Sequence, residues 1–167
     1  MRIYVSCLAS YNAGKLHGTW IDLDTDPDGV FDEIKAMLRR SPEPGAEEWR
    51  IDDTDGVPYT WGIDLMCEVA RMVNEDHAPL ESVVAYIGHV GLWSVTAETV
   101  ADMFNDAFAG QWESEAEFAE EYAHDTCDMS EMGWLAHCID WDHAWRELIN
   151  EYWSAKHAYK RISIFHN

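Results

Sequence analysis

Apolar and polar residues alternate at the beginning of the chain as they do in a half-buried β-strand. Over residues 2–8, Ile3 and Val5 fall on the apolar face. A turn signal at residues 12–14 separates this segment from a second alternating segment, residues 17–23. The pattern therefore predicts a β-hairpin.

A helical period follows over residues 28–39. Its apolar residues fall on one face, and Asp28 stands where an N-cap is expected. A stretch rich in Pro and Gly ends this helix, and residues 48–53 alternate again as a third strand. Residues 1–61 therefore predict a three-stranded antiparallel sheet with one helix on one face.

Helical spacing dominates the middle of the chain. Residues 64–74 and 79–87 carry apolar residues at intervals of three and four. Thr96 stands where the N-cap of a third helix would lie, although position 99 lacks the acid or amide of a full capping box. Residues 62–106 therefore predict a helical module.

The last third of the chain combines helices with a closing strand. Ser114 and Glu117 occupy the two positions of a capping box, which predicts a helix to about residue 122. Residues 131–138 and 140–150 have helical spacing, and residues 161–165 alternate as a strand.

These elements together predict an α+β fold. We expect three small modules without a shared core, because 167 residues suffice for one domain or a few small ones. The modules are an N-terminal sheet with a helix at residues 1–61, a central helical module at 62–106 and a C-terminal α+β module at 107–167.

The net charge is the most unusual property of the composition. The chain has 32 Asp and Glu against 11 Lys and Arg, a formal net charge of −21, and residues 72–145 hold sixteen acidic residues and no Lys or Arg. A small domain needs a net charge of only about 2 to 8 in magnitude for solubility, and a larger one destabilises the folded state by self-repulsion. We therefore expect a basic partner, with a DNA-binding groove as the leading candidate and a salt-adapted surface as the alternative.

The composition argues against several classes of protein. An apolar content of 47% with 13% aromatic residues is too high for a disordered acidic tail. The four cysteines form no C-x-x-C pair, and the sequence has neither a signal peptide nor an apolar run long enough to span a membrane. We therefore expect a cytoplasmic protein with reduced thiols and no membrane partner.

Two clusters are candidates for metal binding. The acids between Asp22 and Asp28 resemble a calcium loop when counted from Asp24, but Lys35 stands where that loop needs a bidentate Glu. Zinc could bind a second set, namely His124, Cys127, His137, Cys138, Asp140, Asp142 and His143. Its spacing matches no standard zinc motif, so an amphipathic helix is the better interpretation.

Catalytic signatures do not stand out. The sequence has no phosphate-binding loop, nucleophile elbow or H-E-x-x-H motif, and acidic residues are too frequent for a pair of them to indicate acid–base catalysis. We therefore expect no cofactor, no bound metal and no enzymatic activity.

Three segments carry a more specific signal. They are residues 3–5 with 11–22, residues 46–53, and residues 108–121 with 139–148. In combination, the tyrosine–asparagine–glycine opening and the aromatic-rich third segment resemble the ArdA-type antirestriction proteins, and the resemblance covers essentially the whole chain.

The resemblance implies a mimic of B-form DNA. Proteins of this family consist of three small domains in an elongated, curved molecule, pair end to end through the C-terminal domain, and occupy the DNA groove of type I restriction–modification enzymes. The partners implied are thus such an enzyme and a second copy of the chain, and not nucleic acid itself. The antirestriction motif of the family maps onto residues 135–148. Residues 153–162 depart from the family pattern because they carry a basic patch of Lys156, Lys160 and Arg161.

The acidic surface of such a mimic would be collective. We expect it to include Asp22, Asp24, Asp26, Asp28, Glu47, Glu48, Asp52, Asp53, Asp102, Asp106, Glu113, Glu115, Glu117, Glu120, Glu121 and Asp125. The expected dimer contact consists of Ile139, Trp141, Ala144, Trp145 and Leu148. These apolar residues could instead belong to the core of their own chain.

Two other functions are compatible with the sequence. The first is a small acidic protein that binds calcium or zinc through the clusters described above. The second is an acidic adaptor for some other basic DNA-binding protein.

Overall fold

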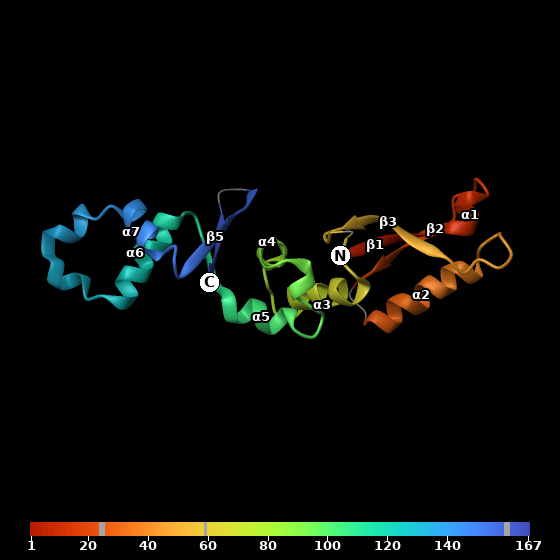
Figure 1. Cartoon of the computed structure of the whole chain (residues 1–167), viewed down its shortest axis with the longest axis horizontal. Coiled ribbons are helices and arrows are strands. Elements are labelled where there is room, and N and C mark those ends of the chain that lie inside the picture. Colours follow the sequence, from red (N-terminus) through yellow and green to blue (C-terminus); the bar gives the residue numbers. More distant parts are fainter. Residues whose placement is uncertain (24–25, 59, 159–160) are drawn as a thin grey trace. The chain divides into compact units, whose positions relative to one another are not determined.

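The computed structural model describes residues 1–23, 26–58, 60–158 and 161–167. The chain divides into two compact units, Met1–Ala101 and Asp102–Asn167, and each contains its own three-stranded sheet (Figure 1). The predicted α+β class is confirmed, with antiparallel sheets near both ends of the chain and helices in the middle. The division into three modules at residues 1–61, 62–106 and 107–167 stays a prediction.

The first sheet has the strand order β2-β1-β3. Its strands are β1 (Arg2–Cys7), β2 (Gly18–Asp22) and β3 (Trp49–Asp55), and both pairings are antiparallel. The register of β1 against β3 shifts between Tyr4 and Val5. The predicted hairpin and third strand are therefore both present. A short helix that the sequence analysis missed, α1 (Leu8–Asn12), lies between β1 and β2.

One helix packs on this sheet. It is α2 (Pro27–Arg39), which runs along one face of the sheet in Figure 1. Its apolar face buries Val30, Ile34 and Met37 against the alternate residues of β1, which are fully buried at Ile3, Val5 and Cys7. Apolar residues repeat every two positions in the strand and about every 3.6 positions in the helix, and the two apolar faces pack together in one core.

The predicted cap of α2 was wrong by two residues. Asp26, and not Asp28, is the N-cap, and its Oδ1 accepts a hydrogen bond from the N–H of Gly29 at 2.8 Å. Pro27 follows at the first helical position, where its fixed φ suits a helix and its missing N–H costs nothing. Asp28 lies in the first turn, where its negative charge is favourable.

Helices make up the rest of the first unit. They are α3 (Ile63–Asn74), α4 (Leu80–Val90), the 3-10 turn η1 (Leu92–Ser94) and the beginning of α5 (Val100–Ala107). The N–H of Val100, the first residue of α5, donates to the carbonyl of Thr96 at 3.0 Å, whereas capping by the Thr96 side chain stays a prediction. The N–H of Thr96 donates to Oγ1 of Thr99 at 3.1 Å, and α5 begins after this turn.

The second unit is an antiparallel sheet covered by helices. Its strands β4 (Phe108–Trp112), β5 (Tyr152–Lys156) and β6 (Ile162–His166) are in the order β4-β6-β5. Between β4 and β5 lie α6 (Glu115–Thr126), the 3-10 segment η2 (Met129–Cys138) and α7 (Trp141–Leu148). Of the three strands, only β6 was predicted from the sequence.

Aromatic residues form the core of the second unit. The buried cluster consists of Phe118, Tyr152, Ile162 and Ile164, and Trp112, Tyr122, Trp145 and Leu148 pack against it. The other face of the sheet carries Phe165, which stacks on Trp153 with ring centroids 4.2 Å apart and also meets Phe104 of α5. Both faces of this small sheet are therefore covered.

Phe118 is the central residue of this core. It is 5% exposed, and its ring contacts the rings of Trp112, Tyr122, Trp145 and Tyr152. We predict that Phe118→Ala lowers the free energy of unfolding by about 3 to 5 kcal/mol, because the substitution leaves a cavity and removes four ring contacts. Urea titration followed by circular dichroism measures this change.

A matched control is available for this prediction. Trp93 is 90% exposed, so Trp93→Ala should change the free energy of unfolding by less than about 0.5 kcal/mol. Equal losses in the two variants would contradict the assignment of Phe118 to the core.

Candidate functional site

Acidic side chains are spread over both units. Residues 1–101 contain 18 Asp and Glu against 7 Lys and Arg, and residues 102–167 contain 14 against 4. Among the described residues of the predicted acidic surface, all are exposed except Glu115, which is half-buried. Asp24 lies outside the described residues. The charge is therefore displayed to solvent by each unit and is not held inside either core.

The predicted acids of the first unit lie on its sheet and beside its helix. Asp22 is on β2, Asp52 and Asp53 are on β3, and Glu47 and Glu48 precede β3. Asp26 and Asp28 stand at the beginning of α2. Several of them also have local structural roles.

These roles fix individual carboxylates. Asp26 caps α2, Asp53 accepts a hydrogen bond from the N–H of Thr54 at 2.8 Å, and Asp52 forms an ion pair with Arg50. Surface pairs of this kind contribute little to stability, about 0 to 1 kcal/mol. Their main effect is to restrict the orientation of the side chain.

The acids of the second unit gather along α5 and α6. Asp102 and Asp106 are one helical turn apart on α5. On α6, Glu117, Glu121 and Asp125 repeat at intervals of four residues and therefore lie along one face. With a rise of 1.5 Å per residue, such a row places a carboxylate about every 6 Å along the helix axis.

Hydrogen bonds hold two of these three side chains, those of Glu117 and Glu121, in place. Oε2 of Glu117 accepts from the N–H of Glu113 at 2.6 Å, and Nε1–H of Trp112 donates to Oε2 of Glu121 at 2.6 Å. The predicted capping box is present in its first half, because Oγ of Ser114 accepts from the N–H of Glu117 at 3.1 Å. The side chain of Glu117 reaches one residue further back than a standard box requires.

The basic patch is partly neutralised within its own unit. Nζ of Lys156 lies 3.3 Å from Oε1 of Glu115, and Oγ–H of Ser154 donates to the same oxygen at 3.0 Å. Burial would raise the pKa of Glu115, but hydrogen bonds from its backbone N–H, Ser154 and Lys156 lower it below its ordinary value. Arg161 is exposed, and Lys160 lies outside the described residues.

The residues predicted for a dimer contact are all half-buried. They are Ile139, Trp141, Ala144, Trp145 and Leu148. Trp145 and Leu148 pack against the core cluster of their own unit, as the intramolecular interpretation requires for these two. The large apolar residues that are exposed nearby are Met132, Trp134 and Leu135 in η2 and Ile149 after α7. These four were not among the predicted contact residues; residues 131–138 were predicted as a regular helix, whereas η2 is a 3-10 segment interrupted at Gly133.

A second group of acids was also missed. Asp64, Glu68 and Glu75 line a pocket of about 440 Å³ together with the predicted Asp26 and with Arg71. Glu68, Arg71 and Glu75 are spaced at three and four residues along α3, which is a helical ion-pair signal that the sequence does contain.

The pKa of one thiol in this pocket is raised. Cys67 lines the pocket, and burial, followed by the charges of Asp64 and Asp26, raises its pKa to about 11. Cys67 therefore remains a neutral thiol at physiological pH and is not an activated nucleophile.

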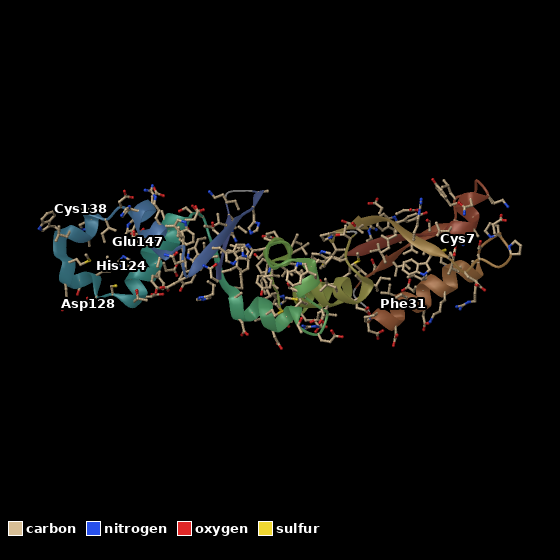
Figure 2. The ribbon with its side chains drawn as sticks, viewed as in Figure 1. Cys7, Phe31, His124, Asp128, Cys138 and Glu147 are labelled. Atoms are coloured by element: carbon tan, nitrogen blue, oxygen red, sulfur yellow. The ribbon has the colours of Figure 1, made fainter. Side chains whose placement is uncertain are left out.

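The metal-binding interpretations receive no support from the geometry. Within the described ranges, no three His, Cys, Asp or Glu side chains are arranged to hold a metal ion. His124 lies on α6 and Cys138 at the end of η2 (Figure 2). All seven zinc candidates are exposed. In the calcium-like segment, Asp26 is engaged in capping α2.

No helix in the described parts of the chain is both long enough and apolar enough to cross a lipid bilayer.

Comparison with known proteins identifies the family. A search of curated proteins finds no match. The family model described as antirestriction protein (ArdA) matches residues 3–161, which is nearly the whole chain and includes both acidic units. The chain therefore belongs to the ArdA family of antirestriction proteins.

Proposed function

We propose that this protein is a DNA mimic that occupies the DNA-binding groove of a type I restriction–modification enzyme and thereby blocks restriction and also modification. The observation that carries the proposal is the display of carboxylates by both units, with Glu117 and Glu121 of α6 held by hydrogen bonds. Membership of an antirestriction family supports the inhibitory role.

The charge density supports electrostatic recognition by a groove lined with Lys and Arg. One strand of DNA carries a phosphate about every 3.4 Å along the axis, whereas the row on α6 carries a carboxylate about every 6 Å. The row is therefore less dense than a DNA strand. Charge density alone would give a weaker attraction to the groove than that of DNA. We therefore infer that the fixed positions of the carboxylates also contribute to binding.

Local hydrogen bonding provides this fixed arrangement. The bonds from Trp112 to Glu121 and from the N–H of Glu113 to Glu117 restrict side chains that would otherwise rotate freely. Binding then costs less side-chain entropy, which is about 0.5 to 1.5 kcal/mol for each flexible side chain immobilised at an interface. The protein acts as a binding partner in the cytoplasm and needs no cofactor or catalytic group for this role.

A homodimer formed through the second unit belongs to the same proposal. Trp134 is 73% exposed, Leu135 is 49% exposed, and both lie in the 3-10 segment η2. Exposed tryptophan side chains such as that of Trp134 are typical anchors of protein interfaces. Pairing two copies would double the number of carboxylates presented to one groove.

The second candidate function is an adaptor for another basic DNA-binding protein. The same exposed carboxylates favour it, since they are not specific to one enzyme. Competition with duplex DNA on a purified type I enzyme separates the two functions.

Inhibition should depend on salt in a characteristic way. Binding of the acidic surface should weaken as salt rises, because charges are screened over a Debye length of about 8 Å at physiological ionic strength. DNA binding should weaken more steeply, since DNA also releases condensed counterions. We therefore predict that the protein displaces a labelled duplex from a type I enzyme more effectively as salt increases, until both cease to bind. Titrations at several salt concentrations measure this.

Displacement that weakens steadily as salt increases would contradict this prediction, and two other results would contradict the proposed mimicry itself. One is inhibition that excess duplex cannot relieve, and the other is inhibition that requires turnover or an added metal ion. Displacement from an unrelated basic DNA-binding protein, but not from the restriction enzyme, would favour the adaptor function.

The carboxylates of the second unit should act together. We predict that neutralising Glu113, Glu117, Glu120, Glu121 and Asp125 by amide substitution weakens inhibition by about tenfold or more, because small contributions of about 0.2 to 1 kcal/mol each add up. Glu120→Gln alone should change inhibition by less than about fivefold. The amides preserve shape and hydrogen-bond acceptors. Loss of all inhibition from one substitution in a folded protein would instead indicate a catalytic or metal-binding role.

Self-association should depend on the exposed apolar residues of η2. We predict a dimer in sedimentation at micromolar concentration, and an increase of about tenfold or more in its dissociation constant for Trp134→Ala, since truncating an interface anchor costs about 2 kcal/mol. Trp93→Ala is the matched control, because Trp93 is also a highly exposed tryptophan but lies in the first unit. A wild-type monomer at this concentration would exclude a strong dimer.

A further inference from the structure

Arg71 is a positive charge in an otherwise acidic part of the chain. It is the one Lys or Arg between residues 51 and 145. A cation on the surface reduces the resemblance of such a protein to DNA in charge. It could still favour inhibition if it changed the arrangement of the surrounding carboxylates. The neighbours of Arg71 show how it could do so.

The guanidinium of Arg71 binds three carboxylates at once. Its Nε lies 3.0 Å from both carboxylate oxygens of Glu68, and its Nη2 donates to Oε1 of Glu68 at 2.7 Å. Its Nη1 lies 3.0 Å from Oδ2 of Asp76 and 3.7 Å from Oε2 of Glu75. The planar fork of an arginine can engage several acceptors in fixed directions, which a lysine ammonium cannot.

These three acids would otherwise repel one another. Glu75 is the C-cap of α3 and Asp76 follows it, so both stand near the negative end of the helix dipole. The left-handed backbone of His77, with φ of 58°, and the bond from the N–H of Ala78 to the carbonyl of Met72 turn the chain back at this point. Arg71, in the last turn of α3, offsets both the dipole and the three negative charges.

The carboxylates remain available to a partner while Arg71 holds them. The side chain of Glu68 is 22% exposed, that of Asp76 is 44% exposed and that of Glu75 is 69% exposed. Asp26 and Asp64 line the same pocket as Glu68, Glu75 and Arg71. With four acids and one base, the lining of this pocket stays negative.

We propose that Arg71 is a positioning residue of the inhibitory surface. It holds Glu68, Glu75 and Asp76 in one arrangement, and the Lys and Arg side chains of the partner groove meet carboxylates that are already in place. This inference rests on the proposed function as a DNA mimic. It adds that the arrangement of the carboxylates, and not only their number, determines inhibition.

The two explanations predict changes of opposite sign. Arg71→Met removes one positive charge from a chain of net charge −21. If the total charge determined inhibition, this variant would inhibit as well as the wild type or better. If Arg71 positions the acids, it should inhibit about two- to fivefold less well, which corresponds to about 0.4 to 1 kcal/mol and lies within the range for exposed ion pairs.

Lys35→Met is the matched control. It also removes one positive charge, and Lys35 pairs with Asp32 in an ion pair whose partners are 63% and 75% exposed. This variant should inhibit as well as the wild type or slightly better. The assay measures displacement of a labelled duplex from a type I enzyme by the wild type and by each variant. Urea titration first shows that each protein is folded under the assay conditions.

A second pair of variants keeps the net charge constant. Arg71→Lys should inhibit less well than the wild type, because an ammonium group cannot replace the forked contacts, whereas Lys35→Arg should be unchanged. This pair decides the question if Arg71→Met does not fold. Full inhibition by folded Arg71→Lys, or equal inhibition by Arg71→Met and Lys35→Met, would overturn the positioning role. Failure of the wild type to displace the duplex would instead refute the proposed function itself.

Discussion

Mutual repulsion among 32 acidic side chains is the constraint to which the rest of the structure responds. A net charge of −21 opposes compaction at every pH at which the carboxylates are ionised. Apolar contacts within each unit oppose this repulsion. The first unit makes them with a sheet whose inward residues Ile3 and Val5 are fully buried beneath α2, and the second with an aromatic core around Phe118.

The acids are placed where local structure tolerates them best. Asp26 and Asp28 stand at the beginning of α2, and Glu115 and Glu117 lie in the first turn of α6, so all four face the positive ends of helix dipoles. The cation Arg71 occupies the opposite end of a helix, in the last turn of α3. The hydrogen bonds that stabilise some of these carboxylates also restrict their orientation. The same contacts therefore contribute both to stability and to the presentation of charge.

Elements whose pattern lies within a short stretch of the sequence were predicted correctly. The alternation in β1 and β2 and the apolar face of α2 are properties of short windows, and the structure confirms them. Strands β4 and β5 were missed because each depends on pairing with β6, which is far away in the sequence from β4. The Arg71 network was predictable in part, since Glu68 and Glu75 have helical spacing from it. Asp76 is five residues from Arg71 and lies beyond the C-cap of α3, so its contact has no helical-spacing signal.

The comparison of charge density explains why arrangement matters to the proposed mimicry. A helical row with one carboxylate about every 6 Å cannot match the phosphate density of a strand. It therefore also condenses fewer counterions and gains less from their release, which lowers both its affinity at low salt and its sensitivity to salt. What the protein can add is rigidity, because a carboxylate held by Trp112 or Arg71 is already oriented when a cation approaches. DNA carries more charges than the inhibitor, and screening by salt reduces this advantage. The inhibitor should therefore compete with DNA best at higher salt concentrations.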